Sequence, residues 1–150
     1  TIPGFFKPVP LGTDVFYYNS HHKGEFYGVP LSEKVLSRFP GVGRQTGFST
    51  GAGHYTFEQM PEIYARCFMG LRLTPHDGLS NTVIELGLMG RKCVCNAGYP
   101  NCIPWTTEED IVAALRSGQD CIGQVDLEVA ERVRRYINIG DAWLNEDYYR

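Results

Sequence analysis

Short apolar runs alternate along this chain with segments whose apolar positions recur at helical spacing. Several runs rich in β-branched or aromatic residues are bounded by polar loops or by glycine and proline, which is typical of buried strands. The expected strands span residues 14–18, 44–48, 69–74 and 92–96. Elsewhere apolar residues recur every three or four positions, which predicts amphipathic helices. The expected helices span residues 31–39, 58–68, 80–89 and 108–118, and a last helix begins near residue 126.

Capping residues indicate where several of these helices begin and end. Ser32 and Ser80 are candidate N-caps. Thr106 or Thr107 precedes three acidic residues, which favour the positive end of a helix dipole. Gly90 is a natural C-terminal stop for the helix that Ser80 begins.

The alternation of strands and helices, without hairpin signals, predicts a parallel sheet covered on both faces. Right-handed crossovers then give a doubly wound, Rossmann-like α/β domain. We expect this single domain to span residues 14–150, after a proline-rich linker or tail at residues 1–13. Such sheets bind ligands at the carboxyl ends of their strands. The loops that follow Tyr18, Thr74 and Asn96 are therefore the expected binding edge.

Composition and charge narrow the classes of function. The chain has 150 residues, of which 43% are hydrophobic and 21% charged, so it is globular rather than disordered. The net charge of −3 gives no general electrostatic footprint for nucleic acid. No apolar run approaches the ~20 residues of a membrane helix, and no signal peptide is visible. We expect a cytoplasmic location, with peripheral membrane association as an alternative.

The cysteines form no regular framework. There are five of them, an odd number that argues against a small disulfide-stapled domain and agrees with a reducing compartment. Cys93, Cys95 and Cys102 invite a zinc interpretation, but their spacing differs from the usual pair separated by two residues. Alternate positions of a buried strand are the favoured interpretation, so we expect no metal.

Glu85 is the most informative single residue, because the helix around it is apolar on nearly every side. Burying a carboxylate costs several kcal/mol unless it is hydrogen-bonded or paired. One interpretation is structural, an internal ion pair or a hydrogen-bonded core carboxylate. The other is functional: the two carboxylate oxygens accept hydrogen bonds from the vicinal hydroxyls of a ribose.

The start of the same helix has the features of a phosphate site. Backbone N–H groups at the first turn of a helix are free and carry a partial positive charge. The residues that would present them are Gly78, Leu79, Ser80 and Asn81. Asp77 lies eight residues before Glu85, and the helix rises roughly 7 Å from Ser80 to Glu85. A diphosphate at the helix start would thus have one carboxylate on each side, which is the layout that a nucleotide sugar requires.

Two carboxylates repel a diphosphate, so the site needs a cation. Lys23 follows the first expected strand at the same sheet edge, and Arg44 is a second candidate. A solvated loop lysine is the alternative interpretation of Lys23. His76 adjoins the helix start and is a candidate contact for a sugar hydroxyl or a phosphate, although a loop histidine without a role is also common.

The segment Asp77-Gly-Leu-Ser-Asn-Thr-Val-Ile-Glu85-Leu-Gly-Leu-Met-Gly90 resembles the carboxylate-x₇-Glu signature of retaining GT-B glycosyltransferases, the glycosyl transferases group 1 family. Residues 19–24 are similar to the lysine-glycine loop of that family. The resemblance spans most of residues 14–140 and is sharpest over 70–95. It implies the C-terminal, nucleotide-sugar-binding half of the GT-B fold, with the N-terminal Rossmann-like acceptor domain absent from this chain.

The resemblance also implies a reaction and the residues for it. A sugar would move from a nucleoside-diphosphate sugar to an acceptor with retention and without a metal or other cofactor. Asp77 would contact the donor sugar, Glu85 the ribose and Lys23 the leaving diphosphate. Asp77 replaces the glutamate usual in the family, which shortens its reach to the sugar, and Gly87 replaces a customary methionine.

Two alternatives remain at the level of sequence. One is a noncatalytic Rossmann-like interaction module, in which Asp77 and Glu85 are merely structural. The other is a sugar-nucleotide epimerase of the GT-B type. An upstream Rossmann-like domain with an acceptor cleft would favour the transferase.

Overall fold

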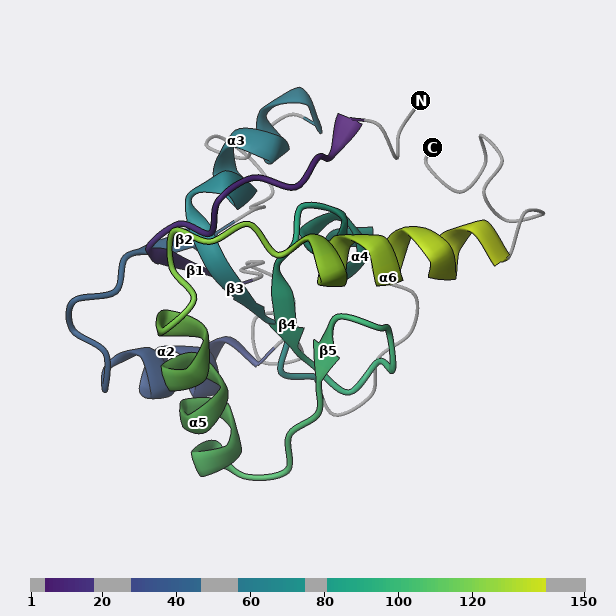
Figure 1. Cartoon of the computed structure of the whole chain (residues 1–150). Helices are drawn as coiled ribbons and strands as arrows, with labels where there is room; N and C mark the ends of the chain where they lie inside the picture. Colours follow the sequence, from purple (N-terminus) through teal and green to yellow (C-terminus); the bar gives the residue numbers. More distant parts are fainter. Residues whose placement is uncertain (1–4, 18–27, 47–56, 75–80, 140–150) are drawn as a thin grey trace.

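The computed structural model describes residues 5–17, 28–46, 57–74 and 81–139. Five strands form one sheet in the order β2-β1-β3-β4-β5, and every neighbouring pair is parallel (Figure 1). The strands are β1 (Asp14–Tyr17), β2 (Arg44–Thr46), β3 (Cys67–Leu71), β4 (Lys92–Val94) and β5 (Cys102–Ile103). The predicted parallel α/β architecture is confirmed.

Helices cover both faces of the sheet (Figure 1). One face carries α2 (Val29–Leu36) and α5 (Glu108–Gln119), and its core includes Val15 and Tyr17 of β1. The other face carries α3 (Met60–Ala65), α4 (Asn81–Leu88) and α6 (Leu127–Ile139), and its core includes Phe16. A single 3₁₀ turn, η1 (Phe57–Gln59), leads into α3. Alternate side chains of β1 thus serve the two opposite cores, as the period of a strand requires.

Local capping signals are partly confirmed. Thr107 caps α5 in a capping box with Asp110, as the acidic first turn predicts. The assignment of Ser32 as an N-cap is wrong, because Ser32 is buried inside α2. That helix begins after Gly28, whose φ of 74° is left-handed, and a Cβ there would collide with the carbonyl of Leu73.

The helix predicted over residues 58–68 is shorter in the structure, and strand β5 is not among the predicted strands. The helix stops at Ala65, and Cys67 and Phe68 already belong to β3, where Cys67 pairs with Asp14 of β1. A short apolar run suits either a buried helix or a buried strand, and pairing with β1 decides between them. The two-residue strand β5 is too short to give a periodic signal.

The described part of the segment that we expect to be a linker packs against the domain. Phe6 is completely buried, and Leu11 is a core residue. The backbone of Leu11 exchanges two hydrogen bonds of 2.8 Å with Gly123 and Gln124, which precede α6. Residues 5–13 therefore form part of the packed structure, because two apolar side chains and a backbone pairing hold them there.

Two negative observations concern the described ranges only. No helix there is long and apolar enough to cross a bilayer. No group of three or more histidine, cysteine or acidic side chains is arranged there to hold a metal ion.

Candidate functional site

The strand order defines one edge of the sheet as the expected binding edge. Neighbouring strands β1 and β3 end in register at Tyr17 and Leu71. The next helix after β1, α2, lies on one face of the sheet, whereas α4, which follows β3, lies on the other. Ligands of doubly wound sheets bind at such a switch point, outside the carboxyl ends of the strands.

Most of the predicted site residues belong to the two segments that follow these strand ends. These are Lys23, His76, Asp77, Gly78, Leu79 and Ser80, all of which lie outside the described residues. Asn81 is the first residue of α4 and is exposed. Arg44 is exposed at the beginning of β2, opposite Val15 rather than at the strand's end, so its role at the carboxyl edge stays a prediction.

Helix α4 is buried along its length from Val83 to Leu88, as its composition predicts. Gly87 lets it approach α6 closely, since a Cβ there would lie 2.6 Å from Val133 and 2.8 Å from the amide of Asn101. The Asn101 amide in turn donates to the carbonyl of Val83 at 2.9 Å. Close packing of α4 on α6 thus favours a glycine at position 87.

Glu85 lies within this helix and is 7% exposed. Its Oε1 accepts a hydrogen bond of 2.7 Å from the hydroxyl of Tyr64 in α3. Tyr64, and not an arginine, is the partner that the described part of the chain gives to this carboxylate. Of the two structural interpretations, the hydrogen-bonded core carboxylate therefore describes the geometry among the described residues, where Glu85 forms no ion pair.

Burial dominates the electrostatics of Glu85. Desolvation raises its pKa to about 7, although the hydrogen bond from Tyr64 acts in the opposite direction. Burial and the nearby carboxylate raise the pKa of Tyr64 well above its usual value, so Tyr64 stays protonated and can donate. Above neutral pH the site therefore holds a carboxylate anion with no cation to compensate it among the described residues.

Sequence reasoning missed the contribution of Arg91, a fully buried side chain. Among the residues that the structure describes, its guanidinium pairs with no carboxylate and donates to backbone carbonyls instead. The acceptors are the carbonyls of Val9 at 2.8 Å, Pro10 at 2.7 Å, Tyr64 at 3.0 Å, Ala65 at 3.1 Å, Cys67 at 3.0 Å and Met89. Arg91 thus joins the N-terminal segment to the end of α3, where helix carbonyls lack internal partners.

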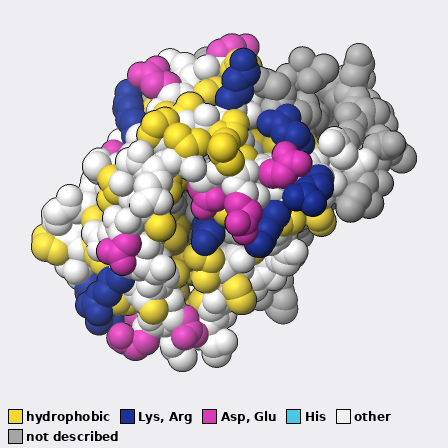
Figure 2. Space-filling view, in the orientation of Figure 1, with side chains coloured by type: hydrophobic (Ala, Val, Ile, Leu, Met, Phe, Trp, Pro, Cys, Tyr) yellow, Lys and Arg dark blue, Asp and Glu magenta, His cyan; other side chains and the backbone are white. Residues whose placement is uncertain are grey.

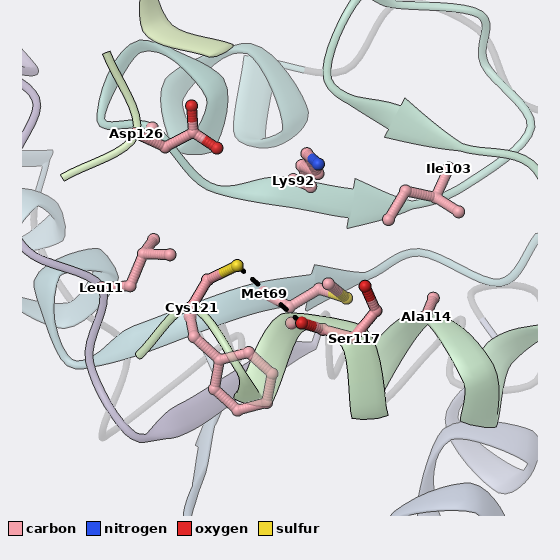
Figure 3. A pocket seen from close by; sticks show the side chains of 11 residues that line it. Leu11, Met69, Lys92, Ile103, Ala114, Ser117, Cys121 and Asp126 are labelled. Carbon is pink, nitrogen blue, oxygen red and sulfur yellow. Dashed lines mark hydrogen bonds between the residues drawn. The ribbon is translucent and has the colours of Figure 1, made fainter. Parts of the chain in front are cut away.

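A small cavity lies elsewhere in the described structure. Its volume is about 50 Å³, and its lining includes residues of β3, β4 and α5 (Figure 3). Lys92 and Asp126 lie on one side of the cavity, opposite Ser117 and Cys121. It has room for no more than one or two waters, and none of the predicted site residues lines it.

The described surface carries charges of both signs. Figure 2 shows acidic and basic side chains interspersed on the face that it presents. Helix α6 contributes pairs one turn apart, such as Arg132 with Glu128 and Arg135 with Glu131. This mixture gives the face no extended basic stripe of the kind that a nucleic acid would need.

Comparison with known proteins finds similarity at the level of fold. No family model and no curated protein matches the sequence. A similar solved structure is the C-terminal domain of a glycosyl transferase group 1 family protein, LpcC, from Francisella tularensis. Its TM-score is 0.51 at 9% sequence identity, over 86% of this chain and 95% of that chain. The chain therefore shares the fold of that domain.

Proposed function

We propose that this chain is the nucleotide-sugar-binding domain of a retaining glycosyltransferase, which moves a sugar from a nucleoside-diphosphate sugar to an acceptor. The observation that carries the proposal is the burial of the Glu85 carboxylate. Among the described residues it is hydrogen-bonded to a tyrosine and paired with no cationic side chain. It lies on α4, the helix that follows β3 at the switch point of the sheet.

A structural role alone accounts poorly for this carboxylate. A raised pKa means that the ionised form destabilises the fold, whereas glutamine could accept the same hydrogen bond without the charge. Titratable groups shifted by burial in this way cluster at functional sites. The vicinal hydroxyls of a ribose would give the anion the hydrogen bonds that it lacks.

The remaining roles rest on the resemblance of residues 77–90 to the family signature. Backbone amides from Gly78 to Asn81 bind the diphosphate, Asp77 contacts the donor sugar, and Lys23 neutralises the leaving group. No metal is required, because a lysine and a helix start provide the positive charge. A second, acceptor-binding domain completes the transferase and excludes water when the two halves close.

The noncatalytic interaction module is the second candidate. The hydrogen bond from Tyr64 is the observation compatible with it, since a core carboxylate also needs a buried donor. The two candidates differ in whether a nucleotide binds at all.

Titration with UDP, GDP and their sugar esters tests the proposal. Binding to the folded state at a ligand concentration a hundredfold above Kd should stabilise the domain by ~2.7 kcal/mol, which a thermal-shift or NMR titration detects. The absence of any effect at millimolar concentrations of all these ligands would overturn the proposal and favour the interaction module.

Substitution of the two candidate cations should identify the diphosphate contact. We expect Lys23→Ala to weaken binding of the nucleoside diphosphate by roughly tenfold or more, because a charge-assisted hydrogen bond is lost. Binding of the corresponding nucleoside should not change, and Arg44→Ala should leave both affinities nearly unaltered. Calorimetry with the two ligands measures this, and a selective loss in Arg44→Ala instead would move the role to Arg44.

A further inference from the structure

We propose that Tyr64 is a positioning residue, which holds the Glu85 carboxylate in the orientation and charge state that a ribose diol requires. This inference rests on the proposed function and assigns a second residue to the same site. Tyr64 is 1% exposed and reaches Glu85 from α3, a different helix, through the 2.7 Å hydrogen bond. A buried tyrosine hydroxyl needs a partner, and here the partner is the candidate binding group.

The ring of Tyr64 is fixed by its surroundings. Phe6 packs against it with ring centroids 5.9 Å apart, and Phe16 of β1 makes an edge-on contact at 5.2 Å. The backbone carbonyl of Tyr64 accepts a hydrogen bond of 3.0 Å from Arg91, which anchors the end of α3. The hydroxyl is therefore held in place whether or not a ligand is present.

The direction of this hydrogen bond follows from the groups that make it. The Tyr64 hydroxyl donates to Oε1 of Glu85, because an ionised carboxylate can only accept. The side chain of Thr82, in the first turn of α4, lowers the pKa of Tyr64, against the larger effects of burial and of Glu85, which raise it.

The hydrogen bond from Tyr64 leaves Glu85 able to bind a diol. A carboxylate has about four acceptor positions, and Tyr64 occupies one of them on Oε1. The bond also opposes the effect of burial on protonation, so more of the carboxylate stays ionised at neutral pH. A protonated Glu85 would instead present a donor, which suits the two ribose hydroxyls poorly.

The test compares Tyr64→Phe with the wild-type chain in calorimetric titrations with UDP and GDP from pH 6 to pH 9. We expect the affinity at pH 7 to fall about tenfold or more, since a hydrogen bond to a charged group is lost. The pH at which binding is half-lost should move upward, and affinity should recover in part at pH 9, where Glu85 ionises again. Recovery at high pH separates positioning from a purely structural role.

The other titratable groups around Glu85 should not mimic this effect. On α3, Tyr64 contacts Glu85, whereas Glu62 is exposed and paired with Arg66. Arg91 stays charged over the tested range and is bonded to the backbone carbonyl of Tyr64, and burial raises the pKa of the Cys67 thiol on β3 above that range. Where α6 meets α4 at Gly87, it presents the apolar Val133. On β4, Cys93 is buried within the same core.

Tyr17→Phe is the matched control. Tyr17 donates to the carboxylate of Glu33 at 3.0 Å, but it belongs to the core on the opposite face of the sheet. The control should leave the affinity and its pH dependence unchanged. Thr82→Val serves as a second variant, because it removes the side-chain hydroxyl that lowers the pKa of Tyr64 and keeps the ring of Tyr64. It should give a smaller shift in the same direction.

Protonation can also be followed without a ligand, by NMR of glutamate labelled with ¹³C at its carboxyl carbon. Tyr64→Phe should raise the pKa of Glu85, and an unchanged value would overturn the inference. Equal affinity and equal pH dependence in Tyr64→Phe and wild type would also overturn it, while the proposed function would survive. If the wild-type chain binds neither UDP nor GDP nor their sugar esters, the proposed function fails and the inference fails with it.

Discussion

Glu85→Gln is expected to stabilise the fold at pH 8 by as much as ~3 kcal/mol and to abolish nucleotide binding. Burial raises the pKa of Glu85 from 4.5 to about 7, so the folded chain holds a proton that the unfolded chain releases. The stability of the wild-type protein therefore decreases as the pH rises from about 4.5 to about 7, and it is constant above that range. Each pKa unit corresponds to about 1.4 kcal/mol, which gives the expected size.

Glutamine removes this penalty because it is neutral at every pH and can still accept from Tyr64 through its amide oxygen. Urea unfolding at pH 8 and at pH 5 measures the difference between the variant and the wild type. The gain should be largest at pH 8 and small at pH 5, where the wild-type Glu85 is mostly protonated. A variant that is less stable at pH 8, or a gain that is independent of pH, would contradict the prediction.

Glu33→Gln is the control for this experiment. The Glu33 carboxylate accepts a hydrogen bond of 3.0 Å from Tyr17, as the Glu85 carboxylate does from Tyr64. Unlike Glu85, however, Glu33 is exposed. The free energy of unfolding should therefore change by no more than ~0.5 kcal/mol. The comparison separates the effect of burying the charge from the effect of the tyrosine–carboxylate hydrogen bond.

Arg91→Met is expected to destabilise the fold by about 3 kcal/mol or more, since each hydrogen bond from a charged donor contributes about 1.5–3 kcal/mol and several are lost together. The substitution removes six hydrogen bonds that a charged donor makes to backbone carbonyls of the N-terminal segment, of the end of α3 and of the residues beside them. The carbonyls of Tyr64 and Cys67 each keep a backbone donor, so the cost arises mainly from the other four. Burial lowers the pKa of Arg91 only to about 10, so the side chain is charged at neutral pH. The substitution therefore removes hydrogen bonds from a charged donor at that pH. Denaturant unfolding gives the size of the effect.

Hydrogen exchange should show where the structure loosens in Arg91→Met. The hydrogen-bonded amides of Leu11 and Gly12 should lose protection first, because Arg91 holds the preceding carbonyls of Val9 and Pro10. Arg132→Met is the control, since its ion pair with Glu128 is exposed on α6 and should contribute no more than ~0.5 kcal/mol. If Arg91→Met lowers the free energy of unfolding by less than ~1 kcal/mol, the prediction is wrong, and water replaces the guanidinium as the donor to these carbonyls.

Local patterns predicted most of the architecture correctly. The period of apolar positions identified α4 and α6, and the acidic turn after Thr107 identified the start of α5. The absence of hairpin signals predicted a parallel sheet, which the strand pairings confirm. These features depend on residues close together in the sequence, so the sequence carries their signal directly.

The boundary between α3 and β3 shows where local patterns fail. The run from Tyr64 to Phe68 suits a helix as well as a strand, and pairing of Cys67 with Asp14 makes its second half a strand. The register of β1 against β3 is a contact between segments about 50 residues apart. No local spacing encodes it.

The candidate site, like the fold, was predicted from the sequence only in part. The apolar surroundings of Glu85 in the sequence determined that this carboxylate is buried, and the order of elements determined the edge at which its helix begins. Only the tertiary structure decided that Tyr64 is its partner and that Arg91 binds backbone carbonyls. The physical reason is that a phenol within an apolar stripe looks like core, and every residue has a carbonyl, so neither partner leaves a recognisable pattern in the sequence.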